Sequence, residues 1–189
     1  MRCICPPLAR CSFVLILALR VVRLVAGGAV NRTIDDVRGD SATGALVQYL
    51  PQVPASSKML WFNQTSCAGC ADVPDASQTF DGTWTAALYQ ADIGSLSVTM
   101  KFTGTAIYVF FVVPNFLADS GLASSISCEF FVDSVAVGTF DHQSNGSGAF
   151  EYNSLVYQNV TLPDGDHVLL IETKGADAAI IIFDYAIYT

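Results

Sequence analysis

Two cysteines separated by two residues have the spacing in this chain that most suggests chemistry. Cys67-Ala-Gly-Cys70 could be a redox pair, part of a zinc site or a local disulfide. A redox pair of this spacing normally opens a helix in a βαβ unit, but here it lies in polar loop sequence. Zinc needs about four ligands, and His142 and His167 are distant along the chain and form no recognisable set with the cysteines. We therefore predict a Cys67–Cys70 disulfide, as an oxidising compartment favours.

A third cysteine, Cys128, falls on the inward phase of an alternating apolar stretch over residues 126–132. An inward-facing cysteine usually behaves as a small buried hydrophobic residue. We predict that Cys128 is a buried thiol.

One carboxylate interrupts an otherwise apolar strand, because Asp184 lies within AIIIFDYAIY at residues 179–188. A buried carboxylate is costly unless it is paired, hydrogen-bonded or bound to a metal. Asp35, Asp36 and Asp40 could supply further hard oxygens of the kind that calcium prefers. The alternative, which we favour, is that Asp184 faces solvent or accepts hydrogen bonds from backbone N–H groups. The cofactor prediction is accordingly none, with structural calcium as the alternative.

Catalytic constellations are poorly supported. A glycosidase needs two carboxylates about 5–10 Å apart, but Glu129, Glu151 and Glu172 lie at strand positions that solvent exposure explains. No nucleophile elbow singles out a serine for a Ser-His-Asp triad, and we expect His142 and His167 on the surface. The sequence predicts a protein that is not an enzyme.

The first 29 residues resemble a secretory signal peptide. Arg2 and Arg10 precede an apolar run at residues 13–19, and small residues follow at 26–29, which predicts cleavage near Gly28 or Ala29. The rival interpretation is a membrane anchor, but no run reaches the roughly 20 apolar residues needed to span a bilayer. We predict a leader at residues 1–29 and one domain at residues 30–189, with no membrane span.

Charge and sequons agree with export from the cell. Losing the leader removes four arginines and leaves five basic against 17 acidic residues, a net charge of −12. Such a surface repels nucleic acid and anionic lipid. Four Asn-x-Ser/Thr sequons are predicted glycosylation sites, at Asn31, Asn63, Asn145 and Asn159. The predicted location is extracellular or the cell surface.

Strands must position the candidate cysteines and carboxylates. In residues 95–113, SLSVTMKFTGTAIYVFFVV, apolar residues alternate with polar ones up to Phe102, and an unbroken apolar run follows from Ala106. Alternation predicts a strand with one wet face, and the continuous run predicts a strand covered on both faces. Because Gly104 tolerates the backbone conformation of a tight turn, we predict that the two strands pair as a hairpin.

Further strands are predicted at 33–37, 44–49, 84–89, 127–132, 135–140, 155–160, 168–172 and 179–188. Turn sequences such as Asp133-Ser134 and residues 163–166 separate them. No stretch longer than about ten residues has a helical period. This spacing predicts an all-β fold, an antiparallel β-sandwich.

Several motifs in order resemble the galactose-binding-like jelly roll: FDGTW at residue 80, FTGTAIYV at 102, FVD at 131, LPDGDHVLLI at 162 and FDYAIY at 183. More closely, residues 31–189 are similar to secreted and surface proteins of mushroom-forming (basidiomycete) fungi, many of which continue into a membrane-spanning helix. The resemblance implies a jelly roll with a history of binding glycans through its loops.

The resemblance also implies candidate sites. In such modules, exposed aromatic rings stack on sugars while amides and acids bind the hydroxyls, which points to Trp61, Tyr152 and Asn153; Trp84 is expected in the core. A calcium ion in related jelly rolls links the first strand to the acid on the last, here Asp184. The predicted function is a non-catalytic module that binds carbohydrate or cell-wall glycan. The alternatives are a surface interaction ectodomain without a sugar site, and a glycan hydrolase.

Overall fold

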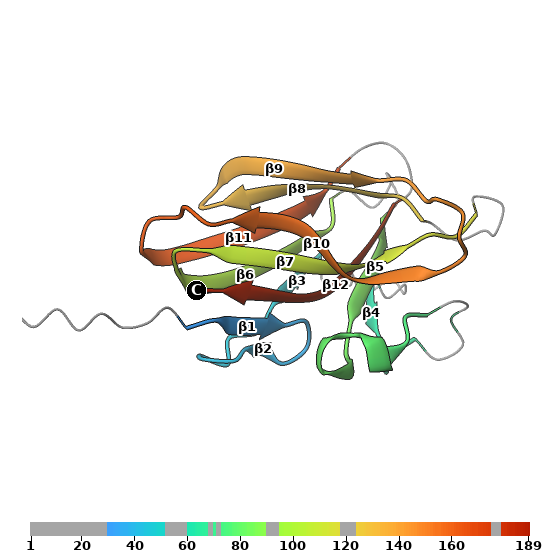
Figure 1. Cartoon of the computed structure of the whole chain (residues 1–189), viewed down its shortest axis with the longest axis horizontal. Coiled ribbons are helices and arrows are strands. Elements are labelled where there is room, and N and C mark those ends of the chain that lie inside the picture. The colour runs from blue at the N-terminus through green and yellow to red at the C-terminus, as the bar shows by residue number, and fades with distance from the viewer. Residues whose placement is uncertain are drawn as a thin grey trace, which may run out of the picture.

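A computed structural model describes residues 30–51, 60–67, 70, 73–89, 95–117, 124–174 and 179–189. The predicted leader at residues 1–29 lies outside the described residues. Two antiparallel sheets face each other across a shared core (Figure 1). The chain is therefore a β-sandwich, as the strand pattern predicts. Within the described ranges, no helix is long and apolar enough to cross a membrane.

The first sheet has the order β10-β7-β12-β1-β2. β5 also pairs with β12, and β4 pairs with β5. The bounds are β1 Arg32–Asp35, β2 Gly39–Asp40, β4 Trp61–Asn63, β5 Thr85–Tyr89, β7 Ile107–Pro114, β10 Phe150–Asn159 and β12 Ala179–Tyr188. Two short 3-10 turns, η1 Ala76–Gln78 and η2 Phe80–Gly82, precede β5.

The second sheet has the order β3-β6-β11-β8-β9. Its strands are β3 Gln48–Leu50, β6 Ser97–Gly104, β8 Ile126–Val132, β9 Val135–His142 and β11 Gly165–Thr173. β8 and β9 form the predicted hairpin. Asp133 and Ser134 both have positive φ angles, of 52° and 69°, as a two-residue type I′ turn requires.

The hairpin predicted for residues 95–113 is wrong. Both strands exist, but β6 pairs with β3 and β11, whereas β7 pairs with β10 and β12 in the other sheet. The chain crosses between the sheets after Gly104, where a Cβ would lie 2.3 Å from the carbonyl oxygen of Thr189. That oxygen accepts a hydrogen bond from the Thr105 N–H at 2.7 Å. On one side of β6, the place that a hairpin partner would take is occupied by β11, which pairs with β6 from Gly104 to Ser97.

The unbroken apolar run of β7 is explained by two hydrophobic layers. Ile107, Val109, Phe111 and Val113 face the core between the sheets. Val112, on the other face, joins Trp84, Ile182 and Cys67 in a second cluster, which the segment before β5 helps to form. Trp84 is 1% exposed, which confirms it as a core residue.

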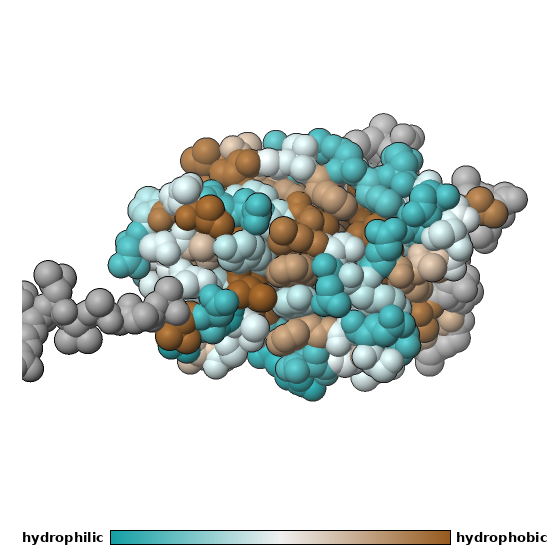
Figure 2. Space-filling view, viewed as in Figure 1, coloured by the Kyte–Doolittle hydropathy of each residue, from teal (hydrophilic) through white to brown (hydrophobic). Residues whose placement is uncertain are grey.

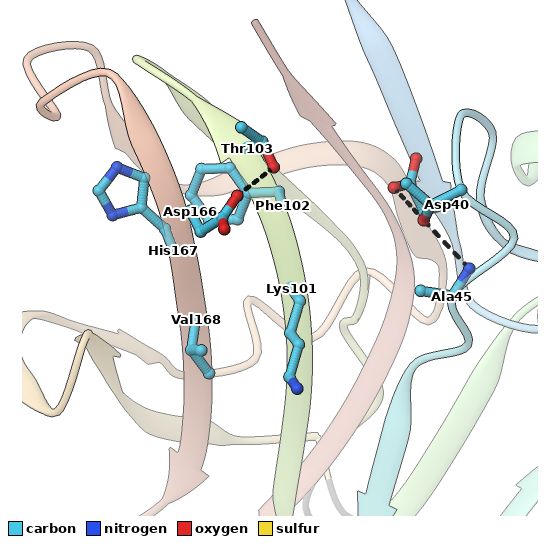
Figure 3. Close-up of a pocket in the computed structure, with 9 residues that line it drawn as sticks. Asp40, Ala45, Lys101, Phe102, Thr103, Asp166, His167 and Val168 are labelled. Carbon is cyan, nitrogen blue, oxygen red and sulfur yellow. Dashed lines mark hydrogen bonds between the residues drawn. The ribbon is translucent and has the colours of Figure 1, made fainter.

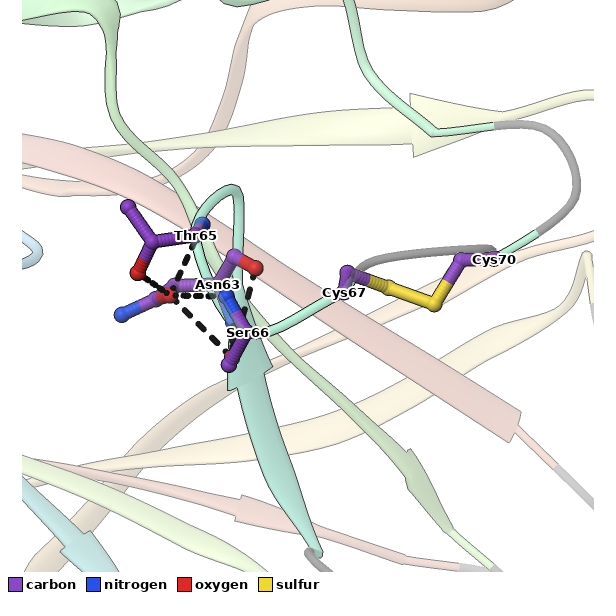
Figure 4. Close-up of a disulfide and its surroundings, with 5 residues drawn as sticks. All are labelled: Asn63, Thr65, Ser66, Cys67 and Cys70. Atoms are coloured by element: carbon purple, nitrogen blue, oxygen red, sulfur yellow. Dashed lines mark hydrogen bonds between the residues drawn. A yellow bond between two sulfur atoms is a disulfide. The ribbon is translucent and has the colours of Figure 1, made fainter.

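The cysteine predictions are confirmed. Cys67 and Cys70 form a disulfide (Figure 4). Cys128 is a free, fully buried thiol, and burial raises its pKa to about 12. The thiolate is the reactive form of cysteine, so this thiol is inert at neutral pH.

Candidate functional site

A pocket opens beside the part of β6 that β3 leaves unpaired. β3 pairs only with Ser97, Val98 and Thr99. Farther along β6, a cavity of 410 Å³ lies between the strand and the loop that follows β2 (Figure 3). Its lining residues are Asp40, Thr43, Ala45, Lys101, Phe102, Thr103, Asp166, His167 and Val168. This volume is within the range of about 300–1,000 Å³ typical of small-ligand sites.

The loop wall of the pocket is fixed by Asp40. Its carboxylate accepts hydrogen bonds from the Ala42 N–H at 2.9 Å, the Thr43 hydroxyl at 2.6 Å and the Tyr188 hydroxyl at 2.8 Å. Burial by itself would raise the pKa of Asp40, but these hydrogen bonds outweigh it and hold the pKa below its usual range. Asp40 is therefore a structural anion that shapes the wall.

The strand wall carries the groups that are available to a ligand. Thr103 and Asp166 face each other across the β6–β11 pair, as do Lys101 and Val168. The Thr103 hydroxyl donates to one Asp166 oxygen at 2.7 Å (Figure 3). Among the described residues, neither the second Asp166 oxygen nor the Lys101 ammonium has a hydrogen-bond or ion-pair partner.

The remaining lining includes Phe102 and His167, whose rings lie 5.3 Å apart. His167 was expected on the surface, but only 6% of it is exposed. Its Nδ1 lies 2.7 Å from an Asp133 oxygen and its Nε2 lies 2.8 Å from the Pro163 carbonyl oxygen. Because both acceptors stabilise the protonated ring, the pKa of His167 is raised. Neither ring nitrogen is free to act as a base.

The arrangement can therefore hold a polar molecule, with hydrogen bonds to its hydroxyl groups and apolar contact along its length. Lys101 is a donor, Asp166 an acceptor and Thr103 can be both. Val168, which is 37% exposed, supplies apolar surface. The lysine and aspartate gave no signal in the sequence, because the pocket depends on β11 aligning with β6 and on where β3 stops.

The three predicted sugar-binding residues are not brought together. Trp61 packs against the main core and its ring lies 4.9 Å from that of Tyr49, while its indole N–H donates to the Leu50 carbonyl at 3.3 Å. Tyr152 packs against the second cluster, as does Phe62. Because successive residues of a strand face opposite sides, Trp61 and Tyr152 lie on opposite faces of the sheet.

Tyr152 and Asn153 lie on β10 and make internal contacts. The Tyr152 hydroxyl accepts a hydrogen bond from the Asp75 N–H at 2.7 Å. The Asn153 side chain accepts from the Tyr185 hydroxyl at 3.2 Å, and its backbone has a φ of 54° at an irregularity in the β10–β7 pairing. Their ligand role stays a prediction.

The acids proposed for calcium form a buried cluster without Asp40. Asp184 is 0% exposed; one oxygen accepts the Phe80 N–H and the other has no hydrogen-bond partner within the described structure. Asp36 accepts from the hydroxyls of Thr83 and Thr85, both at 2.6 Å. Thr83 also lies 3.1 Å from an Asp35 oxygen.

These carboxylates fit protons better than a metal ion. Burial raises the pKa of Asp184 to about 7 and that of Asp36 to about 6, and the charge of Asp35 adds to both shifts. Within the described residues, no three His, Cys, Asp or Glu side chains are placed to hold a metal ion. The oxygens that calcium would need already accept hydrogen bonds, apart from one oxygen of Asp184.

The fold is a β-sandwich with a pocket beside the part of β6 that β3 leaves unpaired. No known family profile matches the chain, and no curated protein matches it. Solved structures similar to it include the Agl-KA catalytic domain (15% identity, TM-score 0.41, 60% of this chain and 22% of that one). Others are an exo-β-1,3-galactanase from Phanerochaete chrysosporium (14%, 0.37, 59% and 24%) and a Paenibacillus sp. cycloisomaltooligosaccharide glucanotransferase (23%, 0.35, 48% and 13%). The chain spans less than a quarter of each of these proteins, and with TM-scores below 0.5 these likenesses assign no function.

Proposed function

We propose that this protein is a secreted, non-catalytic module that binds a glycan in the pocket between β6 and the loop after β2. The observation that carries the proposal is that Lys101 and Asp166, on neighbouring strands of one wall, offer an ammonium and a carboxylate oxygen that have no partner among the described residues. Sugar hydroxyls both donate and accept hydrogen bonds, so a donor and an acceptor held on adjacent strands can engage one ring.

The low pKa of Asp40 supports binding over hydrolysis at this carboxyl. A glycosidase needs a general acid that remains protonated at its working pH. Asp40 has the opposite property, since its hydrogen bonds lower its pKa. The carboxyls with raised pKa values, Asp36 and Asp184, are 2% and 0% exposed, so a substrate has no access to them.

The test is retention on insoluble polysaccharides together with a glycan array. We compare the wild type with Asp166→Asn and Lys101→Ala. Asp164→Asn and Lys174→Ala are matched controls, because they remove the same charges outside the pocket lining. A hydrogen bond to a charged group contributes about 1.5–3 kcal/mol, so each pocket variant should bind about tenfold more weakly or worse. Wild-type protein that binds no glycan, or pocket variants that bind like the controls, would overturn the proposal.

A second candidate, a surface interaction protein without a sugar site, is favoured by apolar residues on the two edge strands. Val135 and Val137 on β9, and Leu155 on β10, are 63%, 37% and 46% exposed. Figure 2 shows hydrophobic residues along the upper edge, where β9 lies in the same view, and over the centre of the near face. Hydrophilic residues separate the two groups. Capture of a protein partner that is lost in Leu155→Thr and kept in Asp166→Asn would support this candidate.

A further inference from the structure

We propose that Asn63 and Asn145 carry N-linked oligosaccharides, at the end of the sandwich away from the pocket. The modification rests on the proposed secretion and not on glycan binding by the pocket, and only the test of where the glycans lie uses that binding. Both asparagines begin sequons, and N-glycosylation needs a surface amide with room for a bulky group.

The side chain of Asn63 is held in one orientation. Its Oδ1 accepts hydrogen bonds from the Thr65 N–H at 3.1 Å, the Thr65 hydroxyl at 2.8 Å, and the Ser66 N–H and hydroxyl, both at 3.1 Å. If the Asn63 amide were flipped, its NH₂ group would face these N–H and hydroxyl donors instead of its oxygen. The hydrogen bonds therefore determine the orientation of the side chain. The amide nitrogen therefore points away from the turn (Figure 4).

The disulfide lies directly beyond this turn. The Cys67 N–H donates to the Asn63 carbonyl at 3.0 Å, and Cys67 is bonded to Cys70. The turn that presents Asn63 is thus anchored at both ends, by β4 before it and by the disulfide after it.

Asn145 lies in the loop that joins β9 to β10 and is exposed. Its Oδ1 accepts the Ser147 N–H at 2.9 Å, and its own N–H donates to the fully buried Asn115 side chain at 3.0 Å. Its Nδ2 lies 3.4 Å from a Glu151 oxygen. A glycosylated amide keeps one hydrogen, so this contact is compatible with modification.

Both sites lie away from the pocket. Asn145 contacts Asn115, which follows the last residue of β7. The first residue of β7, Ile107, lies at the opposite end, beside the turn that leaves the pocket strand β6. Eight residues of strand separate these ends by about 25 Å. In Figure 1, β4 and the β9–β10 loop are on the right, and the C-terminus, which contacts the β6–β7 turn, is on the left. Glycans at Asn63 and Asn145 would leave the pocket open.

The modification is a group transfer. The Asn Nδ2 attacks C1 of the first sugar of a lipid-linked oligosaccharide diphosphate. The N–C bond forms, the C–O bond to the lipid diphosphate breaks, and Nδ2 gives up one of its two protons to solvent. The lipid diphosphate leaves, and no atom is oxidised or reduced.

The test is expression of the full chain through a eukaryotic secretory pathway, followed by glycopeptide mass spectrometry. A parallel version replaces residues 1–29 with a proven leader, so that a failure of secretion is separated from a failure of modification. We expect occupancy at Asn63 and Asn145. Thr65→Ala and Ser147→Ala should each abolish occupancy at their own site, whereas Thr65→Ser should keep it.

Two results would overturn the proposal. One is secreted protein in which Asn63 and Asn145 are unmodified. The other is pocket binding that strengthens by tenfold or more when glycans are lost from the double variant Asn63→Gln/Asn145→Gln, because the glycans would then cover the pocket. Unchanged binding in that variant supports the placement at the far end.

Discussion

The carboxylate of Asp184 accepts a hydrogen bond from the backbone N–H of Phe80, 104 positions earlier in the chain, at 2.9 Å. The Phe80 ring stacks on Tyr185, with centroids 4.6 Å apart. These contacts hold η2 against the outer side of β12. At this point the strand that pairs with one side of β12 changes from β5 to β1. Asp184 therefore ties the covering segment, which is residues 76–82 with η1 and η2, to the sheet.

The stability of the folded protein should fall as pH rises, because Asp184 is buried. The pKa of Asp184 is raised by burial, and by the charges of Asp36 and Asp35, from 3.8 to about 7. Between these values the folded state keeps a proton that the unfolded chain has released, so the free energy of unfolding decreases with pH. We predict that Tm decreases from pH 5 to pH 8.

The variant Asp184→Asn should remove much of this slope. Each pKa unit corresponds to about 1.4 kcal/mol, so at pH 8 the variant should be more stable by up to about 4 kcal/mol. The amide oxygen can still accept the Phe80 N–H. Thermal unfolding of both proteins across pH 5–8 measures the effect. Parallel curves would show that Asp184 is ionised in the folded state.

The pair of His167 and Asp133 should add a second pH dependence of the same sign. The pKa of His167 is raised by the hydrogen bonds to Asp133 and to the Pro163 carbonyl. The stabilisation from these hydrogen bonds is complete below pH 6.5, the pKa of His167 in the unfolded chain. It is lost as pH rises through the higher pKa of His167 in the folded protein. Asp133→Asn keeps an acceptor for the Val168 N–H and tolerates the positive φ. It should lower Tm at pH 6 but change it little at pH 9. Equal losses at both pH values would assign Asp133 a role in the turn alone.

Calcium should have little effect on stability. The oxygens of Asp35 and Asp36 accept hydrogen bonds from Thr83, Thr85 and the Val37 N–H. Binding an ion would require these bonds to break. We expect the same Tm at pH 6 in calcium and in chelator. A rise in Tm with calcium that chelator reverses would restore the ion that the jelly-roll resemblance implies.

Gly39→Ala should be far more damaging than Gly44→Ala. Both glycines have positive φ, 76° and 72°, but a Cβ at Gly39 would lie 2.3 Å from the Ala45 carbonyl oxygen, whereas Gly44 has open space. The left-handed backbone costs about 1–2 kcal/mol in each variant, and only Gly39→Ala adds a clash in the pocket wall. Denaturant unfolding should show a larger loss of unfolding free energy for Gly39→Ala than for Gly44→Ala. Gly39→Ala should also bind glycan more weakly. Equal losses would mean that the loop moves freely.

Local patterns were sufficient to predict most of the strands. β12 has the predicted bounds, and Asp133-Ser134 forms the predicted turn. The Cys67–Cys70 disulfide could also be predicted, because its partners are close in sequence. Strand alternation and turn chemistry are properties of neighbouring residues, and neighbouring residues can be read without knowing the fold.

Pairing across the molecule was decided only by the tertiary structure. The sequence around Gly104 is compatible with a hairpin or with a crossing between sheets, and the choice depends on the pairing of β6 with β11, whose residues lie more than 60 positions away. Lys101 and Asp166 become one wall only because β6 and β11 align, and Asp184 meets Phe80 only because the covering segment folds over β12. Each outcome depends on contacts between residues distant in sequence, which no local pattern encodes.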